Sequence, residues 1–169
     1  MGLRSAFAWL DVNLPGSVYL RESLYGFPVL LTAHVLTMCL FLGLVIMMDL
    51  RLVGVGNRRT SFSDLQRSLF PWQMAGMVLV SISGLALFYA QPLHYFGKAL
   101  FWMKMALLIV AGANALAFHF TTYRSATTWD LPAAVPPSAA RTAGIVSLVV
   151  WAGVLVFGRL VAYSWLTYE

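Results

Sequence analysis

The sequence predicts an all-α integral membrane protein, a four-helix bundle with a short interfacial helix at its N-terminus. Two observations carry this prediction. Hydrophobic residues make up 60% of the 169-residue chain and charged residues only 10%, whereas an ordinary soluble domain has about 25% charged residues. The segment 27–48 also contains no formally charged residue, and it is long enough for one helix to cross a bilayer. We therefore expect a single transmembrane domain over residues 1–169, with its apolar surface in contact with lipid.

Apolar segments place four spans at about residues 27–48, 72–90, 100–120 and 143–165. Before them, Trp9 suits the headgroup level, and the Pro15-Gly16 turn leads into a short helix that carries Arg21 and Glu22. The apolar run in this N-terminal segment is too short for a secretory leader. The second and third spans contain many small residues, which let neighbouring helices approach closely.

Positive residues are unevenly distributed between the two sides of the predicted bundle. The connections after the first and third spans contain Arg51, Arg58, Arg59, Arg67, Arg124 and Arg141, and the other side has only Arg4, Arg21 and Lys98. By the positive-inside rule, the arginine-rich side should face the cytoplasm and both termini should face outward. The net charge of +5 therefore has an explanation in topology. Because the basic residues are spread between loops, we expect no nucleic-acid partner.

Four polar side chains should lie at similar depth in the outer half of the bundle. A rise of about 1.5 Å per residue places His34 about 6 Å, Arg159 about 7 Å and Lys104 about 10 Å outward of the midpoint. Tyr163 follows Arg159 by four residues and shares its helical face. Glu22 is the nearest acidic residue in sequence, and unpaired cations at this depth are costly. We predict that this outer layer binds an anionic or carbonyl-bearing group; the alternative is that Lys104 and Arg159 snorkel to the headgroups.

A second polar set lies in the inner half. Asp49 ends the first span and His119 lies near the end of the third, at similar depth, so a hydrogen bond could join them. Together with Arg51 they are better explained as structural ties between helix ends than as a cofactor site. No residue is assigned a catalytic role, because the six acidic residues are scattered and Walker A, GxGxxG, HExxH, nucleophile-elbow and CxxC motifs are all absent.

The three histidines raise the question of b-type haem, which membrane cytochromes hold between helices through two axial imidazoles. The helical rise separates His34 from His119 by about 18 Å and from His94 by about 12 Å, so no pair is level. The case for haem is therefore weak, and His34 or His119 would be the iron ligand if haem were bound. The single Cys39 excludes a disulfide and a thiolate metal cluster within the chain.

The chain resembles an uncharacterised family of small four-span bacterial inner-membrane proteins. The resemblance rests on Arg21-Glu22-Ser23, Phe27-Pro28, His34-Val35-Leu36, the segment 49–54, Pro71-Trp72, Lys104, Asn114-Ala115, Phe118-His119, Gly158-Arg159 and Ala162-Tyr163. It implies an integral inner-membrane protein of a Gram-negative bacterial type, and it transfers no activity. In such a membrane the arginine asymmetry described above predicts that both termini lie in the periplasm. A looser similarity to four-helix membrane b-type cytochromes is one of architecture alone.

Two classes of function stay open. The first is a redox or cofactor-binding membrane subunit that holds a quinone or haem b through the outer layer. The second is a non-catalytic accessory protein, which would interact with other membrane subunits or with copies of itself in a larger complex.

Overall fold

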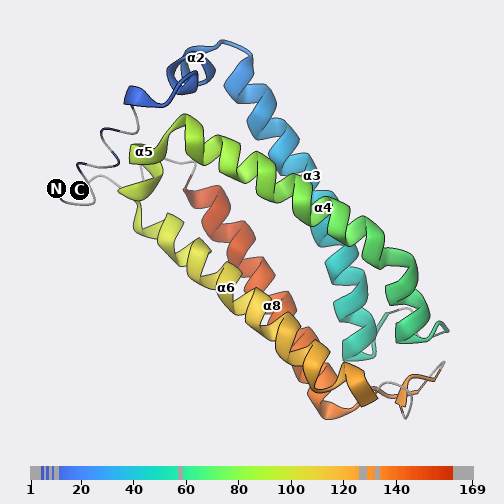
Figure 1. The fold of residues 1–169 in the computed structure, drawn as a ribbon. Helices are drawn as coiled ribbons and strands as arrows, with labels where there is room; N and C mark the ends of the chain where they lie inside the picture. The colour runs from blue at the N-terminus through green and yellow to red at the C-terminus, as the bar shows by residue number, and fades with distance from the viewer. Residues whose placement is uncertain are drawn as a thin grey trace.

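The computed structural model describes residues 5, 7, 9, 12–56, 59–125, 129–131 and 134–161, and over these residues the chain is helical without a β-strand. The elements in chain order are α2 (Ser17–Glu22), α3 (Gly26–Val53), α4 (Phe62–Ala90), α5 (Pro92–Phe96), α6 (Ala99–Phe120), the 3-10 helix η1 (Tyr123–Ser125) and α8 (Ser138–Leu160) (Figure 1). The predicted all-α bundle is thereby confirmed, and α2 is the short helix expected ahead of the first span.

Four helices, α3, α4, α6 and α8, are long and apolar enough to cross a membrane. Their outward faces carry large apolar side chains: Val29 is 64% exposed, Leu85 69% and Ile109 73%. In water an apolar surface of this extent would be strongly unfavourable, whereas lipid tails are as apolar as these side chains. The protein is a multi-pass membrane protein, as the composition predicts.

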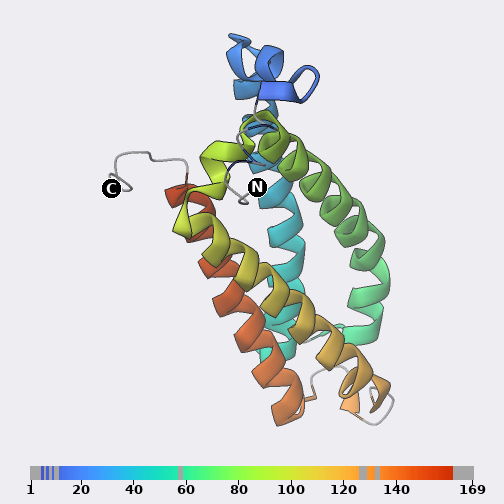
Figure 2. The same cartoon turned by 60° about the vertical axis from the view of Figure 1, so that its left-hand side comes forward.

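The spans form two antiparallel pairs, α3 with α4 and α6 with α8, and the pairs join mainly along α3 and α8 (Figures 1 and 2). Glycines allow the closest approaches. A Cβ on Gly76 of α4 would lie 3.1 Å from the Phe41 Cβ, and a Cβ on Gly144 of α8 would lie 3.0 Å from the Asp49 carbonyl oxygen. The prediction for small residues therefore holds at Gly76 in the second span. Gly144 lies in the fourth span, where no close approach was predicted, and an added Cβ on Gly112 of the third span would meet no neighbouring helix within 4 Å.

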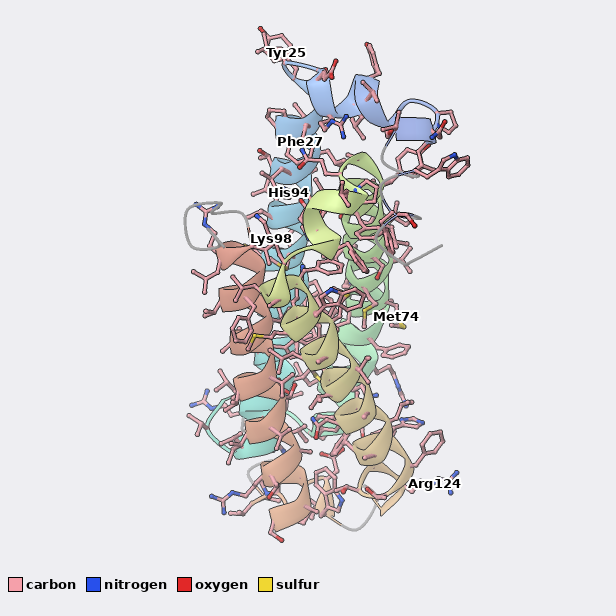
Figure 3. The ribbon with its side chains drawn as sticks, turned by 90° about the vertical axis from the view of Figure 1, so that its left-hand side faces the viewer. Tyr25, Phe27, Met74, His94, Lys98 and Arg124 are labelled. Atoms are coloured by element: carbon pink, nitrogen blue, oxygen red, sulfur yellow. The ribbon has the colours of Figure 1, made fainter. Side chains whose placement is uncertain are left out.

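The two ends of the bundle differ in what covers them, as Figure 3 shows with Tyr25 near one end and Arg124 at the other. We call the end that carries α2, α5 and the last turn of α8 the terminal end, and the opposite end, with the α3–α4 and α6–α8 connections, the loop end. At the terminal end, Phe7 stacks on Phe96 with ring centroids 4.3 Å apart, and the Tyr89 hydroxyl donates a hydrogen bond to the Pro15 carbonyl. The N-terminal segment is thus attached to α4 and α5.

At the loop end, the Arg51 side chain is buried, with only 1% of its surface exposed. Its Nε donates to the Thr60 carbonyl at 2.9 Å and its Nη2 to the Leu131 carbonyl at 3.3 Å. One guanidinium on α3 therefore holds both connections. Of the predicted inner set, Arg51 is thus a residue that ties chain segments together by hydrogen bonds at this end.

Helix α4 begins well before the predicted start of its span, because much of the predicted loop 49–71 is helical. The Ser61 hydroxyl accepts a hydrogen bond from the Asp64 backbone N–H at 3.1 Å. The Asp130 carboxylate accepts from the backbone N–H groups of the first two residues of α4. These contacts satisfy donors that a helix N-terminus otherwise leaves unpaired. Pro71, the residue just before the predicted start of this span, lies inside the helix.

The other spans differ less from prediction. Helix α3 continues to Val53 instead of ending near residue 48, and Gly54 terminates it with a φ of 90°, a left-handed conformation that glycine adopts without strain. Helix α8 begins at Ser138, ahead of the predicted 143, and its described part ends at Leu160. The predicted end at 165 lies outside the described residues.

Candidate functional site

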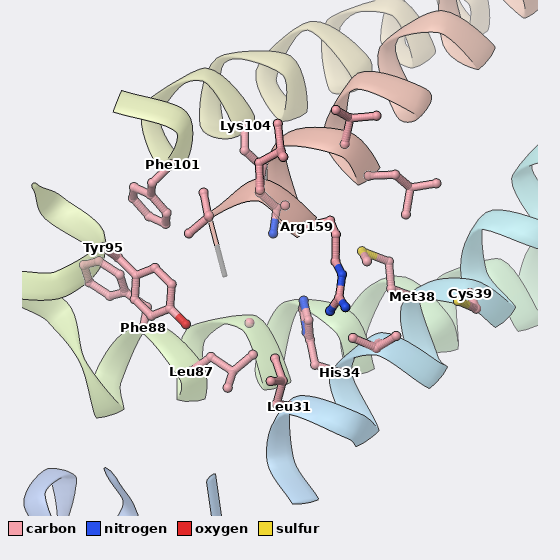
Figure 4. A pocket seen from close by; sticks show the side chains of 17 residues that line it. Leu31, His34, Met38, Cys39, Leu87, Phe88, Tyr95, Phe101, Lys104 and Arg159 are labelled. Atoms are coloured by element: carbon pink, nitrogen blue, oxygen red, sulfur yellow. The ribbon is translucent and has the colours of Figure 1, made fainter. Parts of the chain in front are cut away.

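A cavity of about 730 Å³ lies between the two helix pairs in the half of the bundle nearer the terminal end (Figure 4). His34 of α3, Lys104 of α6 and Arg159 of α8 all line it. The structure therefore brings together three of the four residues predicted to form the outer layer. The fourth, Tyr163, lies outside the described residues. Whether this layer binds a ligand stays a prediction.

His34 is buried, with 8% of its surface exposed. Its Nδ1 lies 2.8 Å from the Ser83 hydroxyl of α4, which also lies 2.8 Å from the Leu79 carbonyl. A hydroxyl has one proton and a carbonyl can only accept, so both contacts are satisfied when Ser83 donates to Leu79 and Nδ1–H donates to Ser83. In that tautomer the Nε2 of His34 is an acceptor.

Gly84 makes this arrangement possible. A Cβ on Gly84 would lie 3.2 Å from the Cε1 atom of His34, closer than a comfortable van der Waals contact. The imidazole therefore has its Nδ1–Cε1 edge next to α4, and Figure 4 shows the ring directed into the cavity. Ser83 holds the ring through the hydrogen bond, and Gly84, which has no side chain, leaves the space that the ring occupies.

The two cations reach the cavity from the opposite helix pair. The Lys104 Nζ and Cε atoms lie 3.6 Å from the point where a Cβ on Gly158 would be, so the lysine stem runs along a strip of α8 that glycine leaves open. Arg159 is the next residue of α8, and Figure 4 shows its guanidinium extending towards His34. Lys104 is half-buried and runs into the bundle, whereas Arg159 extends towards His34 and still has an exposed surface.

The described lining of the cavity contains no carboxylate. Glu22, the acidic residue nearest in sequence, is an exposed residue of α2 and is not part of the wall. Apart from the residues already named and from Tyr95 and Cys39, the wall is aliphatic, aromatic or glycine. The cavity therefore combines a positively charged wall with an otherwise apolar surface.

Tyr95 is a site residue that sequence reasoning missed. It lies on the short helix α5, lines the cavity, and directs its hydroxyl inward (Figure 4). Burial raises the pKa of the Tyr95 phenol above its ordinary value, so the hydroxyl is a neutral donor at physiological pH. Nothing in the sequence showed that α5 turns back over the helix ends, so this position of Tyr95 could not be predicted.

Lys98 fixes the last turn of α8, which carries Arg159. Lys98 is buried, and its Nζ donates a hydrogen bond to the Val161 carbonyl at 2.8 Å. Burial lowers the pKa of the Lys98 ammonium. The bond satisfies a carbonyl that the end of a helix would leave unpaired. Lys98 thus acts as a cap supplied from the α5–α6 connection and helps to place the cavity wall.

The inner pair predicted from depth is not joined in the structure. Asp49 is buried against α8 beside Ser147, and its Oδ2 has no hydrogen-bond partner. His119 is exposed on α6 and stacks on Tyr123, with ring centroids 5.5 Å apart. No hydrogen bond links the two side chains. Asp49 and His119 have similar depth but face different neighbours.

The three histidines occupy three separate places. His34 lines the main cavity, His94 borders a smaller hollow of about 350 Å³ at the terminal end, and His119 lies at the loop end. No group of three or more His, Cys, Asp or Glu side chains that could hold a metal ion occurs among the described residues. The arrangement supplies one imidazole to the cavity, not the pair that a bis-histidine haem needs.

Comparison with protein families, curated proteins and solved structures returned no match to this chain.

Proposed function

We propose that the protein is a membrane subunit that binds the head of a quinone-class cofactor in the cavity between the helix pairs. The observation that carries this proposal is the chemistry of the wall: Lys104, Arg159 and His34 with no carboxylate among the described lining residues. Quinone carbonyls accept hydrogen bonds, and negative charge on the reduced ring would be stabilised by the two cations. Tyr95 supplies a further neutral donor, and the apolar remainder of the wall suits a hydrophobic ring.

Haem is the less favoured cofactor. A haem iron in this cavity would have His34 as its one imidazole ligand. Met38 also lines the cavity, but it lies one turn from His34 on the same helix and face, so both would approach iron from one side. The accessory-protein alternative requires no cavity ligand at all, and it makes opposite predictions for the binding experiment below.

We further propose that the protein lies in a bacterial inner membrane with the loop end in the cytoplasm. The loop-end connections and flanking turns hold six arginines, whereas the terminal end has Arg4, Arg21 and Lys98. Arg51 and Lys98 are both buried in the folded protein. If the buried Arg51 and Lys98 are not counted, the loop end still has more positive residues than the terminal end. The positive-inside rule then places both termini in the periplasm.

Reporter fusions test this orientation. Alkaline phosphatase fused after Glu169 should be active, since it folds only outside the cytoplasm, and a fluorescent protein that folds only in the cytoplasm should stay dark at that position. The same reporters inserted in the α6–α8 connection should give the opposite pattern. A dark phosphatase and a bright fluorescent protein at the C-terminus would overturn the proposed orientation.

Binding of a short-tailed benzoquinone to the purified protein tests the proposed function. Quinones quench tryptophan fluorescence, and titration in detergent should give saturable quenching. Lys104→Met should raise the apparent Kd about tenfold or more, because a hydrogen bond from a charged donor contributes about 1.5–3 kcal/mol. Arg141→Met removes an exposed charge from the loop end and should leave the Kd unchanged.

Three outcomes would contradict the proposal. Equal affinity of wild type and Lys104→Met would place the quinone elsewhere. If no saturable binding is seen and an organic extract of the purified protein contains no ligand, the accessory-protein function is favoured. A Soret band in the purified protein would favour haem.

A further inference from the structure

The cavity has one side on which its lining residues are exposed. Val35 and Cys39 of α3 and Val156 and Arg159 of α8 are exposed, with Val35 at 39% and Val156 at 54%. The lining residues contributed by α4, α5 and α6 are buried or half-buried. The opening of the cavity therefore lies between α3 and α8, on the flank of the bundle.

Aromatic contacts set the limits of this opening. Towards the loop end, Phe41 of α3 meets Trp151 of α8 edge-on, with centroids 5.3 Å apart, and closes the space between the two helices. On the opposite flank, Phe88 of α4 stacks on Phe101 of α6 at 5.5 Å. The α3–α8 opening thus lies at the level of the membrane-spanning segments. The Phe41–Trp151 contact closes it towards the loop end, and the Phe88–Phe101 contact covers the α4–α6 side of the cavity.

The terminal end of the cavity is also covered. The Phe88 ring packs beside Tyr95 of α5, with centroids 6.4 Å apart, and Phe7 of the N-terminal segment contacts Phe88 from above at 6.1 Å. The Lys98–Val161 hydrogen bond holds the last turn of α8 in place next to them. A molecule coming from water at this end would meet aromatic side chains, whereas a molecule in the bilayer would meet Val35 and Val156.

We propose that the α3–α8 opening is a lateral portal through which a membrane-dissolved, uncharged amphiphile with a carbonyl-bearing head reaches the cationic wall directly from the bilayer. The proposal rests on the proposed function and specifies its ligand class and route. A head that already resides in hydrocarbon loses little hydration on passing the valine rim, whereas a permanently charged lipid head would have to be desolvated there. The apolar tail would remain between α3 and α8 in contact with lipid.

A wide side chain at the rim should block this route. Val156→Trp places an indole at the mouth, while Val149→Trp, two turns earlier on the same exposed face of α8, does not line the cavity. In protein reconstituted into vesicles of neutral phospholipid, stopped-flow quenching should show benzoquinone association slowed about tenfold or more by Val156→Trp. Val149→Trp should associate at the wild-type rate. Val156→Phe serves as a second, smaller obstruction if the tryptophan variant does not fold.

The natural thiol at the rim gives an independent measurement on the wild-type chain. Cys39 is the only cysteine and is exposed beside the opening. A membrane-permeant maleimide should label it, and saturating long-tailed isoprenoid quinone should slow the labelling, because the tail would occupy the portal. Equal labelling rates with and without bound quinone would overturn the proposal.

The outcomes separate this inference from the proposed function. Wild-type binding with unchanged association in both Val156 variants would reject the portal and leave quinone binding intact. No wild-type quinone binding would reject both. Displacement of bound quinone by phosphatidylglycerol, but not by phosphatidylcholine, would show that an anionic lipid is the preferred occupant and would reject the uncharged ligand class.

Discussion

Replacing Arg51 with alanine should lower the free energy of unfolding by about 3 kcal/mol or more. The side chain is 1% exposed and donates to the carbonyls of Thr60 and Leu131. Each hydrogen bond from a charged donor contributes about 1.5–3 kcal/mol, and truncation leaves buried acceptors unpaired. SDS-induced unfolding in mixed micelles, followed by circular dichroism, would measure the loss.

The matched control is Arg141→Ala, which removes the same group from an exposed position at the same end and should change the unfolding free energy by less than about 0.5 kcal/mol. Arg51→Lys should fall between the two, because an ammonium keeps the charge but cannot reach both carbonyls with the geometry of a guanidinium. A loss in Arg51→Ala no larger than in Arg141→Ala would mean that the two connections are not held by this side chain.

Gly144→Val should also destabilise the protein, by about 1–3 kcal/mol or more, which is the usual effect of overpacking a close contact. A Cβ at this position would lie 3.0 Å from both the Asp49 carbonyl oxygen and the Leu52 Cβ. Backbone cannot move aside as a flexible side chain can, so α3 and α8 would have to separate. The same unfolding assay measures the change.

Gly112→Val provides the comparison, since no heavy atom of another helix lies within 4 Å of the added Cβ. Both substitutions place a β-branched residue in the interior of a transmembrane helix, so the difference between them isolates the contact with α3. Equal effects at Gly144 and Gly112 would show that helix propensity, and not the α3–α8 contact, determines the loss.

Depth along the membrane could be predicted from the sequence, and the direction of each side chain around its helix could not. The fixed rise of a helix placed His34, Lys104 and Arg159 in one layer, and the structure brings all three to one cavity. The same reasoning placed Asp49 and His119 at equal depth, yet one faces α8 and the other lies exposed on α6. Which neighbouring helix a side chain faces depends on how the helices pack against one another.

Contacts made by the connecting segments could not be predicted from the sequence either. The local pair Ser61 and Asp64 marks the start of α4, but the second cap, Asp130, comes from a connection far along the chain and could not be found from the residues around the helix. Tyr95 reaches the cavity because α5 turns back over the helix ends. For Asp130 and for Tyr95 the partner is distant in sequence, so no local pattern encodes these two contacts.

The buried guanidinium of Arg51 has a consequence for how the protein is made. During translation, α3 and α4 emerge before residue 131 has been synthesised, so the nascent first hairpin still lacks one of the two acceptors that hold Arg51 in the finished fold. With the loop end in the cytoplasm, as proposed above, the charge would be available at that moment to orient the hairpin in the translocon. When the second hairpin arrives, the same charge is withdrawn from water and joins the two connections. One residue would thus first direct insertion and later complete assembly.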